Sequence, residues 1–89
     1  MSASATAPIP VVLYGRAGCH LCDEARAALE TIAAGERSLE LREVDIESDS
    51  RLHAAYLERI PVIEIEGEVV SELEPDLDRL HARLDTLRR

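Results

Sequence analysis

The stretch Gly15–Ala25, GRAGCHLCDEA, holds both cysteines of the chain, Cys19 and Cys22, with two residues between them. It follows the apolar run Ile9–Tyr14, which predicts a strand, and it opens a segment with helical spacing. Two cysteines at this spacing, where a strand turns into a helix near a βαβ pattern, are typical of a thiol–disulfide redox site. This stretch therefore predicts a chemistry as well as the fold around it.

The predicted helix start favours a reactive Cys19. The first backbone N–H groups of a helix lack intrahelical acceptors, and the helix dipole adds partial positive charge there. Both effects stabilise a thiolate, which is the form of cysteine that attacks disulfides. Cys22 lies one turn further along, near enough to close a disulfide with Cys19. We therefore predict Cys19 as the nucleophile and Cys22 as the resolving cysteine.

The 89 residues predict one domain with one core, which we place at residues 9–89, behind a flexible tail at residues 1–8. The formal net charge of −8 argues against binding to nucleic acid or to anionic membranes. No stretch approaches the roughly 18 apolar residues of a membrane span. The N-terminal residues lack the features of a secretory signal, so we expect a cytoplasmic protein. We also expect a monomer. In that compartment two cysteines form a catalytic or metal-binding pair.

The first half of the chain predicts a β-α unit. The run Ile9–Tyr14 is β-branched and mostly unalternating, which predicts a strand buried on both faces. From His20 to about Ala34, apolar residues recur at steps of three and four, which predicts a helix with one buried stripe. Gly35 is expected to end that helix.

The middle of the chain predicts a second strand, a short helix and a hairpin. In Leu39–Ile46 the apolar positions change parity, so we predict a strand with a bulge or strong twist near residues 42–43. Residues 48–50 offer an N-cap for the short helix. Two strand-like runs, Ile60–Ile65 and Val69–Ser71, flank a glycine-centred gap and predict a β-hairpin, whose Glu64, Glu66 and Glu68 should form a solvated face.

The last segment predicts a helix that starts at residues 74–76, with Pro75 in its first turn. Leucines at positions 77, 80, 84 and 87 predict a buried stripe, with Leu73 packing just ahead of it. Two heptads are too few for a coiled coil, so we favour a helix that faces the core. The predicted order is β-α-β-α-β-β-α, an α/β fold with a four-stranded mixed sheet and flanking helices.

This order, with the Cys19–Cys22 motif after the first strand and Ile60-Pro61 opening the third, resembles the thioredoxin fold. More closely, it is similar to the small glutaredoxin-like branch of bacterial proteins, from Val11 to about Leu84. The resemblance implies a thiol–disulfide oxidoreductase. It also implies a cis peptide bond before Pro61 and a backbone contact between Ile60 and the substrate.

The sequence departs from both patterns at several positions. Leu13 stands where thioredoxins carry a buried acid. Arg16 stands where glutaredoxins carry a lysine, and it would contact a carboxylate of glutathione or of a protein partner. Ser71 and Glu72 replace a Gly-Gly pair that approaches glutathione, and the bulk and charge of Glu72 oppose that approach. We therefore expect no resident cofactor, and glutathione stays open as a reductant only.

Residues around the cysteines would tune the site. A protonated His20 would lower the pKa of Cys19, whereas Asp23 and Glu24 would raise it, and the sequence leaves the balance open. Tyr14 either packs beside the site or belongs to the core. We expect His53 and His81 on the surface, a disulfide-containing protein or small thiol as substrate, and a reductase or glutathione for recycling.

Two alternatives stay open. In the first, Cys19 and Cys22 are half of a zinc site or part of an iron–sulfur ligand set. Because the sequence has no second C-x-x-C and no H-x₃₋₅-H, a second chain in an oligomer would supply the remaining ligands. Alternatively, the chain is a binding module that keeps the fold without turnover. In that case both cysteines would be dispensable.

Overall fold

The computed structural model describes residues 8–35 and 39–87. Most of the predicted tail, residues 1–7, lies outside this part of the chain, and the domain limits remain a prediction. The elements, in chain order, are β1 (Ile9–Gly15), α1 (His20–Gly35), β2 (Leu39–Asp45), a 3₁₀ turn (Ile46–Ser48), α2 (Ser50–Tyr56), β3 (Val62–Ile65), β4 (Glu68–Glu72) and α3 (Leu77–Leu87). The predicted element order is confirmed.

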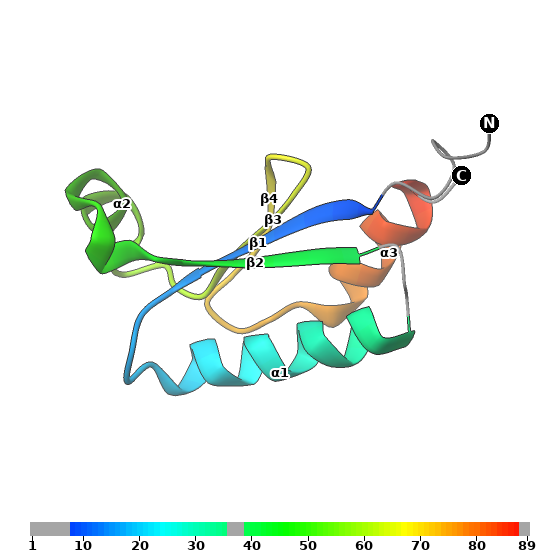
Figure 1. Cartoon of the computed structure of the whole chain (residues 1–89), viewed down its shortest axis with the longest axis horizontal. Helices are drawn as coiled ribbons and strands as arrows, with labels where there is room; N and C mark the ends of the chain where they lie inside the picture. Colours follow the sequence, from blue (N-terminus) through cyan, green and yellow to red (C-terminus); the bar gives the residue numbers. More distant parts are fainter. Residues whose placement is uncertain (1–7, 36–38, 88–89) are drawn as a thin grey trace.

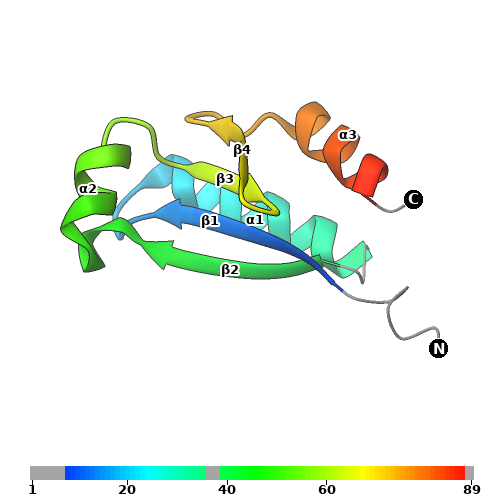
Figure 2. The ribbon, with the colours of Figure 1, turned by 90° about the horizontal axis from the view of Figure 1, so that it is seen from above.

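The four strands form one mixed sheet in the order β2-β1-β3-β4. β1 pairs with β2 in parallel and with β3 antiparallel, and β3 pairs antiparallel with β4. Figures 1 and 2 show α1 and α3 on one face of the sheet and α2 beyond its end. The α/β fold class with a mixed four-stranded sheet is therefore as the sequence predicts.

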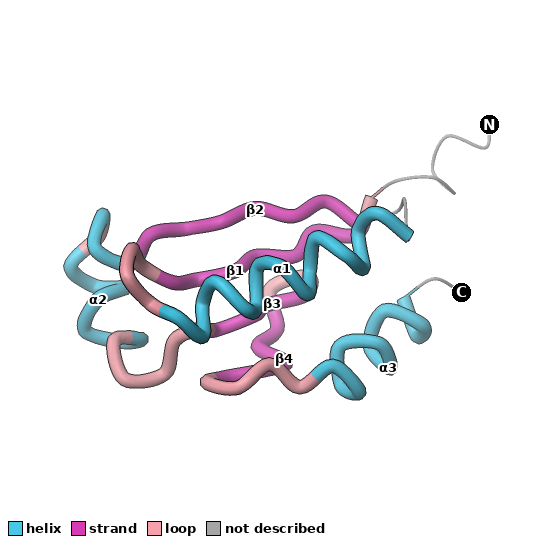
Figure 3. The backbone as a smooth tube through the Cα atoms, turned by 90° about the horizontal axis from the view of Figure 1, so that it is seen from below, coloured by secondary structure: helices cyan, strands magenta, loops and turns pink. Residues whose placement is uncertain are grey.

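The main core lies between the sheet and the two helices α1 and α3. Its buried residues come from alternate positions of the strands and from one stripe of each helix: Ile9, Val11, Leu13, Ala25, Leu29, Ile32, Ile63, Ile65, Val70, Leu80 and Leu84. Figure 3 shows both helices lying across the same side of the strands. The core therefore needs no aromatic residue.

The prediction that β1 is buried on both faces is wrong. Ile9, Val11 and Leu13 are buried, whereas Val12 and Tyr14 are only half-buried. The two long helices cover one face, whereas Leu52 and Tyr56 of the short α2 pack near the end of the other, in the same cluster as Tyr14. A central strand of this sheet therefore alternates in burial although its sequence does not alternate in polarity.

Of the bulge or strong twist predicted near residues 42–43 of β2, the bulge is wrong. β1 and β2 pair residue by residue from Ile9–Leu39 to Gly15–Asp45. The parity change has another cause: Leu39 and Leu41 pack against the core, and Glu43 takes the same parity to reach Arg26 of α1. The irregular register lies instead between Ile63 and Glu64, where β3 pairs with β4.

The turns follow the local sequence closely. Glu66 and Gly67 join β3 to β4 with φ angles of 53° and 83°, the two positive values of a type I′ hairpin turn. Asp49 caps α2, because its carboxylate accepts the N–H groups of Arg51 at 2.8 Å and Leu52 at 3.4 Å. The predicted hairpin and the predicted cap segment are therefore both present.

The start of α3 differs from its prediction. Asp76 caps the helix by accepting the N–H of Arg79 at 3.1 Å, so Pro75 lies before the cap and not in the first turn. Leu80 and Leu84 are buried as predicted, but Leu73 and Leu77 are exposed. No helix in the described part of the chain is long and apolar enough to cross a membrane.

Candidate active site

Cys19 and Cys22 form a disulfide at the amino end of α1, with their Cα atoms 5.2 Å apart. Cys19 occupies the N-cap position: its carbonyl accepts the N–H of Asp23 at 3.1 Å, and its Sγ accepts the N–H of Cys22 at 3.1 Å. A side-chain acceptor at this position satisfies a backbone donor that the helix leaves unpaired. The same N–H would stabilise negative charge on the Cys19 sulfur.

The two sulfurs differ in accessibility. Cys19 is half-buried, whereas Cys22 is only 1% exposed. Gly18, with φ of 78°, turns the chain from β1 into the helix just before Cys19. The accessible sulfur is therefore the one at the helix terminus, as a nucleophile requires, and the buried sulfur lies one turn behind it.

Gly15 is a site residue that the sequence reasoning missed. A Cβ atom at this position would lie 2.9 Å from the Sγ of Cys22 and 3.1 Å from its Cβ. Such contacts are closer than packed side chains tolerate, so the absence of a side chain makes room for the Cys22 sulfur. The only signal in the sequence is a glycine at the end of a strand.

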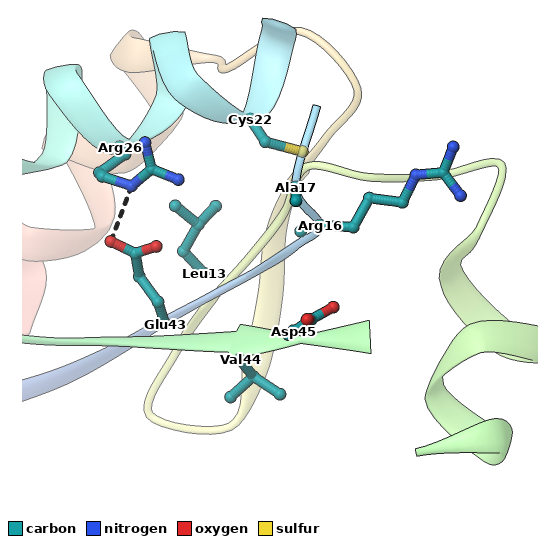
Figure 4. Close-up of a pocket in the computed structure, with 9 residues that line it drawn as sticks. Leu13, Arg16, Ala17, Cys22, Arg26, Glu43, Val44 and Asp45 are labelled. Carbon is teal, nitrogen blue, oxygen red and sulfur yellow. Dashed lines mark hydrogen bonds and ion pairs between the residues drawn. The ribbon is translucent and has the colours of Figure 1, made fainter. Parts of the chain in front are cut away.

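A pocket of about 220 Å³ lies behind Cys22, between α1 and the carboxyl ends of β1 and β2. Figure 4 shows the Cys22 sulfur beside the loop after β1, and the Glu43 carboxylate reaching up to Arg26. Arg26 donates to Glu43 at 2.8 Å and to Asp23 at 3.0 Å, and these hydrogen bonds raise the pKa of Arg26. Leu13 also lines the pocket.

The Ile60–Pro61 peptide bond is cis, and both residues are buried. Ile60 belongs to the same apolar cluster as Cys22, and Cys19 packs against that cluster. The N–H of Ile60 donates to the carbonyl of Tyr56 at 3.0 Å, so it is engaged within the protein. The expected backbone contact to substrate is thus limited to the Ile60 carbonyl.

Two interactions tie the segment before Pro61 to the end of β4. The N–H of Leu73 donates to the carbonyl of Arg59 at 3.0 Å, and the side chains of Arg59 and Glu72 form an ion pair. The hydrogen bond from Arg59 lowers the pKa of Glu72. Glu72, which replaces a glycine of the glutaredoxin pattern, is therefore held by Arg59.

A model of the glutaredoxin-like domain family (DUF836) matches residues 10–86. The chain belongs to this glutaredoxin-like family. Two solved structures are similar over most of both chains. Protein Ne2328 from Nitrosomonas europaea is 32% identical with a TM-score of 0.74, covering 85% of this chain and 91% of that one. Protein XcR50 from X. campestris is 36% identical with a TM-score of 0.67, covering 85% and 96%.

Thioredoxins share the fold of this glutaredoxin-like domain. The thioredoxin of Trichomonas vaginalis is 18% identical with a TM-score of 0.66, covering 89% of this chain and 78% of that one. No curated protein matches the chain. Family, fold and the disulfide at Cys19 and Cys22 together support a redox-type role.

The charged neighbours of the disulfide in this glutaredoxin-like domain have partners of their own. The guanidinium of Arg16 lies 3.2 Å from the carboxylate of Glu47, and both side chains are exposed. His20 is 85% exposed, and its Nε2 lies 3.0 Å from the carboxylate of Glu24. A substrate anion at Arg16 would therefore compete with a weak surface ion pair.

Tyr14 lies beside the site and not in the main core. Its hydroxyl donates to Glu64 at 3.1 Å, and the hydroxyl of Tyr56 donates to the same carboxylate at 3.5 Å, with the two rings 4.9 Å apart. Burial and the charge of Glu64 raise the pKa of Tyr14. The prediction that Glu64 lies on a solvated face is wrong, whereas Glu66 and Glu68 are exposed.

The described residues 8–35 and 39–87 contain no group of three or more His, Cys, Asp or Glu side chains that could hold a metal ion. His53 is half-buried, and His81 is exposed on α3.

Proposed function

We propose that the chain is a thiol–disulfide oxidoreductase that exchanges electrons through Cys19 and Cys22. The observation that carries the proposal is the hydrogen bond from the Cys22 N–H to the Cys19 sulfur at the helix terminus. This donor and the helix dipole favour the Cys19 thiolate over the thiol. The other sulfur lies within disulfide distance behind it.

The exchange proceeds in two displacements. In the reduced protein the Cys19 thiolate attacks one sulfur of a substrate disulfide, which forms a mixed disulfide and releases the other substrate sulfur as a thiolate. Cys22 then loses its proton and attacks the Cys19 sulfur, which forms the Cys19–Cys22 disulfide and releases the second substrate thiolate. The substrate gains two electrons, and each released thiolate takes up a proton. An external thiol or a reductase restores the dithiol.

The surrounding residues have supporting roles. Pro61 is buried and has no N–H, and the Ile60 carbonyl before it serves as the acceptor for the substrate chain. Arg16 binds a substrate carboxylate when that anion displaces Glu47. His20, when protonated, adds positive charge beside Cys19. The sulfurs themselves carry the electrons, so the reaction needs no resident cofactor, and it needs a reducing compartment such as the cytoplasm.

Two single substitutions test this function. Cys19→Ser removes the attacking sulfur, so reduction of a peptide disulfide should fall to the uncatalysed rate. Cys22→Ser removes the resolving sulfur, so the peptide should remain attached to Cys19 and be detected by mass spectrometry of the intact protein. Parental activity in Cys19→Ser would reject the proposal, and equal trapping on either cysteine would reject the assigned order.

A further inference from the structure

The proposed exchange requires a buried thiol to lose its proton. Cys22 attacks the mixed disulfide as a thiolate, yet this residue is only 1% exposed. A buried thiol resists ionisation, because surroundings of low dielectric constant disfavour the charged form. The N–H of Cys22 donates to the Cys19 sulfur, so it stabilises charge on Cys19 and not on Cys22. The second displacement therefore needs a proton acceptor on the inner side of the site.

The pocket behind Cys22 gives a proton a path away from this sulfur. Cys22 lines the pocket together with residues of α1, of β2 and of the end of β1. Its volume of about 220 Å³ is several times the roughly 30 Å³ that one water molecule occupies in the liquid, and charged side chains line it. Water can therefore enter the pocket and carry the proton of Cys22 away from the Cys19 side, which the substrate occupies during the exchange.

Four charged side chains line the pocket, and one of them fits the role of acceptor. Arg16 and Arg26 are hydrogen-bond donors only. Glu43 accepts from the Nε of Arg26 at 2.8 Å, and Figure 4 shows its carboxylate turned toward that arginine. Asp45 accepts the N–H of Glu47 at 2.8 Å through Oδ1, and within residues 8–35 and 39–87 no group donates to its Oδ2. Asp45 therefore keeps one carboxylate oxygen for a proton.

The register of the sheet places Asp45 on the same side as the Cys22 sulfur. Asp45 pairs with Gly15 across β1 and β2, and a Cβ on Gly15 would lie 2.9 Å from that sulfur. Paired residues on neighbouring strands lie about 4.8 Å apart and project to the same face. Leu41, two pairs of residues earlier in β2, packs against the core under α1, so Asp45 projects to the face that α1 covers. Asp45 is exposed, so it can pass the proton on to solvent.

We propose that Asp45 accepts the proton of Cys22, through water in the pocket, when Cys22 resolves the mixed disulfide. This inference rests on the proposed function and assigns the base of its second displacement. As the Cys22 sulfur bonds to the Cys19 sulfur, the substrate thiolate leaves and the proton of Cys22 passes to the Asp45 carboxylate. The resulting carboxylic acid then returns the proton to solvent. One disulfide breaks and one forms, and no electrons pass through Asp45.

The test separates the two displacements in time. The reduced protein is mixed rapidly with a modest excess of a symmetric aromatic disulfide that releases coloured thiolates. The first thiolate appears when Cys19 attacks, and the second appears when Cys22 resolves, at a rate independent of reagent concentration. We expect Asp45→Asn to slow the second phase about tenfold at pH 7, less than the roughly hundredfold or more of a base in direct contact, and to leave the first phase unchanged. Equal second phases in the variant and the parent would overturn the inference.

The direction of the change distinguishes a proton acceptor from a nearby charge. Removal of a negative charge near Cys22 would by itself favour the thiolate and speed the second phase. Loss of the acceptor should slow it and make it rise about tenfold per pH unit between pH 6 and 8, because only thiolate formed by equilibration with solvent then reacts. The other charged groups that line the pocket, Arg16, Arg26 and Glu43, remain in place. A faster second phase, or the pH profile of the parent, would contradict the assignment.

Glu43→Gln is the matched variant, because it removes the other carboxylate of the same pocket. Glu43 is engaged with Arg26, so its second phase should keep the pH slope of the parent. Asp45→Asn keeps a side-chain oxygen for the Glu47 N–H, so the 3₁₀ turn should remain. A second phase that slows and steepens equally in both variants would assign the effect to the charge of the pocket and overturn the role of Asp45.

The same traces separate this inference from the proposed function. In Cys22→Ser only the first thiolate should appear. A parent protein without a second phase would reject the dithiol exchange itself. A normal second phase in the parent that Asp45→Asn leaves unchanged would reject this inference alone, whereas a slower and steeper one in Asp45→Asn supports both.

Discussion

At the scale of residues, the proposed chemistry depends on close contacts between the two cysteines and the backbone around them. Cys19 caps α1 with its sulfur, and Cys22 lies against the backbone of Gly15. Both arrangements involve the backbone. The N–H of Cys22 donates to the Cys19 sulfur, and the bare backbone of Gly15 leaves room for the Cys22 sulfur. The spacing of the cysteines predicts the first arrangement, but nothing local predicts the second, because Gly15 meets Cys22 only once β1 and α1 have packed.

Gly15→Ala should destabilise the oxidised protein by about 1–3 kcal/mol, the usual cost of forcing an extra methyl group into a packed site. The added Cβ would lie 2.9 Å from the Cys22 sulfur. Urea denaturation of the oxidised protein measures the effect. Gly35→Ala is the matched control: nothing lies within 4 Å of its Cβ position at the end of α1, so it should be neutral or slightly stabilising. Equal effects of the two changes would count against the close contact.

The same distinction applies to other single residues. The sequence predicts the helix-terminal cysteines and the Asp49 segment as a cap because each acts on its own few neighbours in the chain. Glu64 is different: its place between the hydroxyls of Tyr14 and Tyr56 joins three elements. The engaged N–H of Ile60 likewise depends on the end of α2. Such roles depend on contacts between elements, and the spacing of apolar residues along the chain does not predict these contacts.

At the scale of elements, two loops beside the cis peptide bond are held together. One precedes β3 and carries Arg59, and the other follows β4 and begins with Leu73; a backbone hydrogen bond and the Arg59–Glu72 ion pair join them. Arg59 also lies 5.0 Å from the centre of the Tyr56 ring, which connects the pair to α2. The position of Pro61 therefore depends on elements far apart in the sequence.

The Arg59–Glu72 pair should make stability depend on pH in a defined direction. Because the hydrogen bond from Arg59 lowers the pKa of Glu72 in the folded protein, its stabilising contribution is present above the unfolded-state pKa, about 4.3, and is lost as pH falls through the folded-state value. Glu72→Gln should lower the urea midpoint slightly at pH 7 and converge with the parent in acid. Glu40→Gln, an exposed acid outside the described ion pairs, serves as the control. A gap between Glu72→Gln and the parent that widens as pH falls would contradict the assignment.

The order of the elements was predictable from the sequence, whereas the face of each element that is buried was predictable only in part. The leucine spacing of α3 correctly predicts burial of Leu80 and Leu84, but Leu77, in the first turn, is exposed. In β2 the apolar parity changes because Glu43 takes a core-side position to pair with Arg26, not because the strand bulges. For Glu43 the deciding factor is a partner on another element, which the sequence of β2 alone does not contain.

At the scale of the whole molecule, the helices α1 and α3 pack on one face of the sheet, and the disulfide lies at the amino end of α1. The main core and the site cluster are separate groups of buried residues, although both use strands β1 and β3. Substitutions that alter the charge or the loops of the site should therefore have a limited effect on the main core. That separation is consistent with a glutaredoxin-like fold in which Ser71 and Glu72 replace a glycine pair.

The central claim is that the whole protein passes two electrons to a substrate disulfide through its cysteines. The most direct measurement mixes the fully reduced protein with one equivalent of a peptide disulfide and follows both partners by mass spectrometry. We predict that the protein loses the mass of two hydrogen atoms as the Cys19–Cys22 disulfide forms, while the peptide disulfide is converted into its two thiols in equal amount. A protein that keeps both thiols while the peptide disulfide stays intact would contradict the account.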